Sequence, residues 1–209
     1  MCAPKGGGTT LSAPKRVAGP LAFQVRLTTD ATRPRRVYLT WVRASEVGLI
    51  RFAGPDNPIE VTRSDDGGRT WRSPVRVSAL GRERVLVLGR SADGGATWRE
   101  SLVDDRVVPT RRFIAFLPPF PSLAVDHRDG RIFVAFEDGR LSPSDVHLWS
   151  LARGQRRWSG PTRVNDTAER DGTSQYLPKI AVARDGRMDV AYYDRRRDAG
   201  NHLNEVSLQ

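Results

Sequence analysis

The sequence predicts an all-β protein built from short antiparallel strands, and three observations support this prediction. Apolar residues come in short runs that 19 Gly and 14 Pro residues interrupt. This pattern is typical of short strands and not of long helices. An octet of the form Ser-x-Asp-Gly-Gly-x-Thr-Trp occurs at 64–71 and again at 91–98. A longer strand–turn–strand pattern also occurs twice, at 120–140 and 177–196.

The first predicted sheet has a strand at 37–41, with no clear strand before it. A strand at 59–62 leads into the first octet, and another at 74–77 follows it. Within the octet, Asp can accept backbone N–H groups, Gly tolerates positive φ, and Ser and Thr hydroxyls can bind the turn backbone. The Trp ring can cover the apolar side of the hairpin. The octets are therefore predicted to be structural clips between two strands, formed by Ser64, Asp66, Gly68, Thr70 and Trp71 and by Ser91, Asp93, Gly95, Thr97 and Trp98.

The second octet follows a predicted strand at 85–88. The sequence between the two octets is too short for four strands. The second sheet is therefore predicted to lack its first two strands and to keep only the strand before the octet and the octet itself.

The longer repeat predicts two β-hairpins, closed by Asp-Gly turns at 129–130 and 185–186. A third strand at 145–149, a degraded octet at 151–158 and a fourth strand at 161–164 follow the first hairpin. Four antiparallel strands, with the octet between the third and the fourth, form one unit. Such units in tandem indicate the blades of a β-propeller.

The predicted propeller is incomplete, at about three and a half blades. Its last strand, 205–209, aligns with the third strand of a unit, which suggests a chain truncated at one end or both. We expect a flexible leader with a possible first strand at 1–34 and a partial propeller at 35–209. Because four sheets cannot close as six would, exposed sheet edges are expected, and copies of the chain could associate through them.

The chain is basic, with a formal net charge of +10, and only Lys5, Lys15 and Lys179 of its 34 basic residues are lysines. The arginines are spread along the chain among 24 acidic residues. A nucleic-acid binder often concentrates its basic residues on one face or in a tail, so nucleic acid is not the predicted partner.

Other classes of site and segment find no support in the sequence. Cys2 is the only cysteine, so an internal disulfide is impossible, and no apolar stretch is long enough to span a membrane. The N-terminus lacks the apolar core of a signal peptide, which indicates a cytoplasmic protein or a true start further upstream. No metal or cofactor is predicted, because ligand spacing is missing around His127, His147 and His202.

The two octets and the hairpin pattern, Leu/Phe-Pro-x-x-Ala-Val followed by Asp-Gly-Arg-x-x-Val-Ala, resemble the BNR or Asp-box repeat family. That family is best known from sialidases and related six-bladed propellers, and the resemblance covers 35–209. It implies a sialidase-like propeller that hydrolyses or recognises glycans, in an extracellular or cell-surface location. It also implies that the octets are structural and lie on the face away from the active site.

The face opposite the octets is the predicted functional face. In a four-stranded blade it carries the loop between the second and third strands and the connection to the next blade. Carboxylates can act as acid and base on a glycosidic bond, and arginines can hold an anionic sugar. The predicted catalytic residues are Asp138, Asp194 and Glu137, and the predicted substrate-binding residues are Arg43, Arg140 and Arg196. The same face should also receive Glu46, Arg195, Asp166, Glu169, Asp171 and Tyr176.

Departures from the sialidase pattern leave three functions open. The segment that carries the first sialidase arginine, Phe/Tyr-Arg-Ile-Pro, has no match, and no tyrosine can be assigned as the nucleophile. The chain is either a sialidase-like glycoside hydrolase, a non-catalytic propeller that binds glycans or proteins, or a truncated product without independent activity. Whether it is an enzyme is not decided by the sequence.

Overall fold

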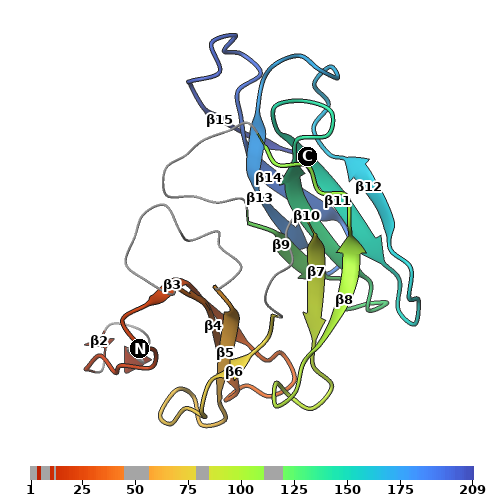
Figure 1. Ribbon diagram of the computed structural model, residues 1–209. Coiled ribbons are helices and arrows are strands. Elements are labelled where there is room, and N and C mark those ends of the chain that lie inside the picture. The colour runs from red at the N-terminus through yellow and green to blue at the C-terminus, as the bar shows by residue number, and fades with distance from the viewer. Residues whose placement is uncertain (1–3, 6–9, 12, 45–56, 79–84, 111–119) are drawn as a thin grey trace. The chain divides into compact units, whose positions relative to one another are not determined.

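The computed structural model describes residues 4–5, 10–11, 13–44, 57–78, 85–110 and 120–209, and these residues form no helix (Figure 1). None of them therefore forms a helix that could span a membrane. The chain divides into unit 1, residues 1–83 and 87–102, and unit 2, residues 84–86 and 103–209. Near the N-terminus, β1 (Pro4–Lys5) pairs with β2 (Thr10–Leu11).

Unit 1 contains a four-stranded antiparallel sheet in the order β3-β4-β5-β6. Its strands are β3 (Ala22–Thr29), β4 (Val37–Arg43), β5 (Ile59–Ser64) and β6 (Val75–Arg76). Side chains alternate between buried and partly exposed along β4, where Val37, Leu39 and Trp41 are buried. This period of two is typical of a strand with one face on a core.

The first strand of this sheet, β3, was not recognised as a clear strand from the sequence and lies inside the predicted leader. Its alternation is weak because the pairing with β4 shifts between Phe23 and Arg26, and Gln24 has a φ of 54°. Such a bulge places two residues opposite one and disrupts the inside–outside pattern on which sequence interpretation depends.

A two-stranded sheet, β7 (Leu86–Arg90) with β8 (Arg99–Asp104), contains the second octet. The prediction that this sheet lacks two strands is confirmed among the described residues. The first residue of β7, Leu86, and the last residues of β8, from Val103 on, belong to unit 2. There Leu86 and Val103 pack with Val134, Phe136 and Trp149.

Unit 2 contains two further antiparallel sheets, which share one hydrophobic core. The first has the order β12-β11-β10-β9 and the second the order β13-β14-β15. Ala135 and Val146 from the first sheet pack with Ile180, Val190 and Tyr192 from the second. The strands are β9 (Ser122–Val125), β10 (Ile132–Asp138), β11 (Asp145–Leu151), β12 (Ser159–Arg163), β13 (Gln175–Val182), β14 (Met188–Asp194) and β15 (Glu205–Leu208).

The predicted fold class is confirmed. The described residues are all-β, and two of their sheets have the four-stranded antiparallel order of propeller blades, beside one sheet of three strands and two of two strands. Both long repeats form the predicted hairpins, β9–β10 and β13–β14, and their turn residues Gly130 and Gly186 have φ of 76° and 90°. That positive φ is the conformation for which the Asp-Gly turn selects glycine.

Candidate functional site

The two octets form hydrogen-bonded turns of the same design. In the first, Asp66 accepts hydrogen bonds from the Ser64 hydroxyl at 2.8 Å and from the Thr70 backbone N–H at 2.8 Å. In the second, Asp93 accepts the equivalent bonds from Ser91 at 2.8 Å and Thr97 at 2.9 Å. The Thr hydroxyl bonds hold the pKa of both carboxyls well below the usual range, so both are ionised at neutral pH. These side chains are engaged within their own turns.

In unit 2, the loop between β10 and β11 meets the connection between β12 and β13. The Gln175 N–H donates to the Ser144 carbonyl at 2.8 Å, and Ser144 and Ser174 form an isolated parallel bridge. The Arg170 N–H donates to the Ser142 hydroxyl at 3.3 Å. The prediction that these two loops share one end of the sheets is therefore confirmed for this unit.

Asp138 lies at the end of β10 and is fully buried. Its Oδ1 accepts the Arg140 backbone N–H at 2.7 Å and Arg140 Nε at 2.9 Å. Its Oδ2 accepts Arg140 Nη2 at 2.9 Å and the Val108 N–H at 3.0 Å. Four donors thus occupy this carboxylate, and a two-point contact fixes the orientation of the Arg140 guanidinium.

Asp194, at the end of β14, repeats this arrangement and is also fully buried. It accepts the Arg196 backbone N–H at 2.9 Å and Arg196 Nε at 2.6 Å. Its other donors are the Gln175 side-chain amide at 3.1 Å and the Ser207 hydroxyl at 2.7 Å. Burial raises the pKa of Asp194, but the hydrogen bonds from Ser207, Arg196 and Gln175 outweigh it and the pKa is lowered.

A third clip in which an aspartate two residues before an arginine binds its side chain closely lies at the opposite end of the first sheet of unit 2. There Asp126 accepts the Arg128 backbone N–H at 2.9 Å and Arg128 Nη2 at 2.8 Å. The hydrogen bond from the Arg128 side chain lowers the pKa of Asp126 to about 2. Asp-x-Arg is therefore a local clip in which a carboxylate at a strand end holds the arginine two residues later.

The two arginines of the predicted functional face differ in their remaining contacts. Arg140 Nη2 also reaches Asp104 at 3.0 Å, and its guanidinium lies 5.8 Å from the centre of the Trp149 ring. Hydrogen bonds from Arg106, Arg140 and Trp149 outweigh the effect of burial and lower the pKa of Asp104. Among the residues that the structure describes, Nη1 of Arg140 has no hydrogen-bond partner.

Arg196, in contrast, has a partner at each nitrogen. Nη1 pairs with Asp166 at 2.6 Å, Nη2 donates to the Tyr192 hydroxyl at 3.2 Å, and Nε binds Asp194. The hydrogen bonds with Asp166 and Asp194 outweigh the effect of burial and raise the pKa of Arg196.

Glu137 points to a different neighbour from Asp138. Its Oε2 accepts the Leu177 backbone N–H at 2.5 Å, at an irregularity in β13 between Tyr176 and Lys179. Leu177 has a φ of 51°, so this bond supports a backbone conformation that a branched residue adopts only under constraint. Tyr176 is buried here and stacks on Tyr193, with ring centres 5.5 Å apart.

A buried amide network links the two sheets beneath the loops. The Asn165 amide nitrogen donates to Asp145 at 2.7 Å and to the Gln175 side-chain oxygen at 3.2 Å. The Gln175 amide nitrogen continues to Asp194, and the Asn165 oxygen accepts the Val146 N–H at 2.9 Å. Satisfied buried networks of this kind fix one arrangement of the elements they join.

A hollow of about 340 Å³ opens beside Arg140 at this end of unit 2. Its only charged lining residues among those the structure describes are Arg140 and Arg170. The side chain of Arg170 has no hydrogen-bond or ion-pair partner within the described part of the chain, and Arg170 is exposed. The full lining is Gly139, Arg140, Leu141, Ser142, Pro143, Arg170 and Gly172.

The remaining predicted residues are placed as follows. Arg43 lies in unit 1 on β4, has a 61% exposed side chain and pairs with Glu60 at 3.4 Å. Arg195 lies over the Tyr176 ring at 5.1 Å, while Asp171 accepts the Thr173 N–H at 2.8 Å. Glu169 is exposed, and Glu46 lies outside the described residues.

Sequence reasoning missed Arg170, Ser142 and Asp104, of which only Asp104 carries a sequence signal, the Asp-x-Arg pattern that it forms with Arg106. Arg170 occurs in an irregular connection, where only its positive φ of 61° is distinctive. Within the described residues, no group of three or more His, Cys, Asp or Glu side chains is arranged to hold a metal ion.

Comparison with known proteins gives similarity of fold at low sequence identity. No protein-family model and no curated protein sequence matches the chain. A protein of unknown function from Dyadobacter fermentans matches 83% of this chain and 62% of its own at 17% identity, with a TM-score of 0.52. A Hadza microbial sialidase matches 90% and 34% at 15% identity, with a TM-score of 0.40. An α-L-arabinofuranosidase from Fusarium graminearum matches 91% and 45% at 14% identity, also with a TM-score of 0.40. The chain thus spans less than two thirds of each of these proteins.

Proposed function

We propose that this protein is a sialidase-like Asp-box propeller that recognises a glycan carrying a carboxylate, through the hollow beside Arg140 and Arg170. The observation that carries the proposal is the pairing of two guanidinium groups in a hollow whose described lining has no acidic residue. Guanidinium groups bind carboxylates through charge-assisted hydrogen bonds, so the Arg170 side chain and the Nη1 group of Arg140 together favour an anionic sugar.

The contacts of Arg140 support this role. Asp138 and Asp104 hold its Nε and Nη2 edge, which leaves the Nη1 donors for a ligand. An arginine that is already held in place loses little side-chain entropy when it binds a ligand. A mobile arginine would lose more entropy in making the same contact. Asp138 therefore acts in this proposal as a positioning residue.

Glycoside hydrolysis by Asp138, Asp194 and Glu137, with Arg43 and Arg196 as further substrate ligands, is the competing prediction. A catalytic carboxyl must come within hydrogen-bond reach of the glycosidic oxygen or of a water. Asp138 and Asp194 each accept four hydrogen bonds and are fully buried, so either would have to release its arginine to reach a substrate. This geometry favours recognition over turnover.

Binding and turnover can be separated by two measurements on the full chain. Binding of N-acetylneuraminic acid is followed by calorimetry, and turnover by release from a fluorogenic sialoside. We expect the unsubstituted chain to bind N-acetylneuraminic acid. Arg170→Gln should weaken this binding about tenfold, because one charge-assisted contact is lost. Arg184→Gln is the matched control, because Arg184 is exposed in the β13–β14 turn at the other end of its sheet.

Each outcome has a defined meaning. Binding that is equally weak in Arg170→Gln and Arg184→Gln, or binding that neither substitution changes, would refute the proposed hollow. Turnover that Asp138→Asn or Asp194→Asn abolishes in protein that urea denaturation shows to be folded, while Asp126→Asn retains it, would establish the hydrolase instead. The Asp126 variant controls for the loss of an Asp-x-Arg clip as such.

A further inference from the structure

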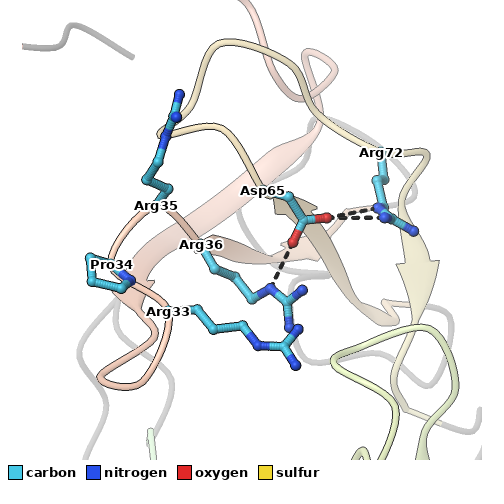
Figure 2. Close-up of a pocket in the computed structure, with 6 residues that line it drawn as sticks. All are labelled: Arg33, Pro34, Arg35, Arg36, Asp65 and Arg72. Atoms are coloured by element: carbon cyan, nitrogen blue, oxygen red, sulfur yellow. Dashed lines mark hydrogen bonds and ion pairs between the residues drawn. The ribbon is translucent and has the colours of Figure 1, made fainter.

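A second hollow, of about 570 Å³, lies in unit 1 between the β3–β4 turn and the first octet (Figure 2). The β3–β4 turn and the first octet lie at the same end of this sheet. The predicted functional face is at the opposite end. The site is therefore separate from the one proposed above, in its residues and in its unit. Its lining residues are Arg33, Pro34, Arg35, Arg36, Asp65 and Arg72.

The charges of this hollow are strongly unbalanced. Asp65 is its only acidic lining residue among those described, and it accepts contacts from Arg36 at 2.7 Å and Arg72 at 3.0 Å. A further arginine, Arg63, reaches the same carboxylate at 3.1 Å. Burial raises the pKa of Asp65, but these arginines outweigh it and lower the pKa, so Asp65 is ionised. One negative charge is thus shared by three permanent positive charges.

Additional guanidinium groups stand beside this cluster without compensation. The Arg33 side chain has no hydrogen-bond or ion-pair partner anywhere in the part of the chain that the structure describes. Figure 2 shows Arg33 and Arg36 extending in the same direction, Asp65 between Arg36 and Arg72, and Arg35 pointing away from Asp65. Like charges that extend together repel one another unless an anion lies between them.

The cluster depends on one position of the octet. Asp65 is the variable second residue, and the second octet has Ala92 at the equivalent place. The turn hydrogen bonds are accepted by Asp66, from the Ser64 hydroxyl and the Thr70 N–H, and Asp65 takes no part in them. Asp65 is therefore free to orient the surrounding arginines, an arrangement that Ala92 cannot reproduce.

We propose that this hollow binds a tetrahedral oxyanion group, a sulfate or phosphate ester, with Arg33, Arg36 and Arg72 as its ligands. The planar guanidinium fork matches the paired oxygens of such groups, and Arg33, Arg36 and Arg72 all line this one hollow. Asp65 serves as a positioning residue that holds Arg36 and Arg72. The volume suits a small molecule that carries the ester and not only the bare ion.

The proposal is tested by calorimetric titration of the full chain with four probes at low ionic strength. The probes are inorganic sulfate, inorganic phosphate, a heparin-derived sulfated disaccharide and glucose 6-phosphate, and a DNA duplex serves as the control for general attraction to a basic chain. Arg33→Gln is expected to weaken binding of the preferred ester about tenfold, the effect of losing one charge-assisted contact. Arg26→Gln is the matched control, because Arg26 is exposed on β3 and does not line the hollow.

The pattern across the probes and variants decides the outcome. Tighter binding of the disaccharide identifies a sulfated saccharide as the source of the oxyanion, and tighter binding of the sugar phosphate identifies a phosphorylated metabolite. If Arg33→Gln binds as the unsubstituted chain does, the proposal is overturned. It is also overturned if Arg26→Gln weakens binding equally, or if only a DNA duplex binds, since general attraction to a basic chain would explain both. A urea unfolding midpoint unchanged in Arg33→Gln shows that the fold is intact.

Discussion

The ends of β10 and β14 carry the same short sequence, Asp-x-Arg, and build the same carboxylate–guanidinium clip, yet their arginines are differently available. Arg196 has partners at Nε, Nη1 and Nη2, including Asp166 from the preceding connection. Arg140 lines a hollow together with Arg170, and its Nη1 has no hydrogen-bond partner among the described residues. The comparison teaches that a repeated motif fixes local geometry, while the loops around it decide whether a ligand can reach it.

The largest expected effect is the loss of the buried carboxylate in either clip. Asp138→Asn leaves the largely covered Arg140 without its main partner, and breaking such a buried pair costs about 3–5 kcal/mol of unfolding free energy. Asp194→Asn should cost a similar amount. Urea denaturation measures both. Asp126→Asn should cost clearly less, because the side chain of Arg128 is 56% exposed. Equal losses in all three variants would show that burial does not distinguish the clips.

A smaller effect is expected from the amide network that connects the clips. Asn165→Ala removes the acceptor of the Val146 N–H and the donor to Asp145, so buried polar groups lose their partners. We expect a loss of about 2–3 kcal/mol in unfolding free energy. Thr167→Val is the control, since Thr167 is buried beside Asn165 and accepts only one of its bonds. A larger loss in the Thr167 variant would contradict the central role of Asn165.

The pH dependence of stability should reveal the clip at Asp126. Its pKa in the folded protein is about 2, below the ordinary value of 3.8, so the folded state favours the ionised form. The resulting stabilisation is complete above about pH 4 and is lost as the pH falls toward 2. Unfolding free energy measured across this window should fall less steeply in Asp126→Asn than in the unsubstituted chain. Identical slopes would mean that Arg128 does not hold this carboxylate in solution.

The smallest effect on stability is expected at Arg170. Its side chain is exposed and has no partner within the described residues, so Arg170→Gln should change unfolding free energy by no more than about 0.5 kcal/mol. Arg196→Gln, measured beside it by thermal unfolding, should lower stability more, because three contacts are lost. A marked destabilisation by Arg170→Gln would give Arg170 a structural role and weaken its assignment to ligand binding.

Most of the strands were predicted from local sequence patterns. Where these patterns did not predict the structure, the reason is physical. The octets, the Asp-Gly turns and the strand at 145–149 were predictable because each depends on residues a few positions apart. No clear strand was predicted at β3, because its bulge breaks the alternation, and residues 1–34 were predicted to be a flexible leader with a possible first strand. The strand ends at Asp138 and Asp194 were located correctly, but their burial and complete hydrogen bonding were not predictable from a strand pattern.

The sequence alone determined the all-β class, the hairpins and the clip turns, because glycine conformation, turn carboxylates and a period of two act within one segment. Only the tertiary structure decided which arginines line the same hollow. Arg140 and Arg170 are 30 residues apart, and their meeting depends on how the loop at Ser142–Ser144 packs on the connection before β13. Contacts between distant segments depend on packing and charge balance in three dimensions, which no short-range pattern encodes.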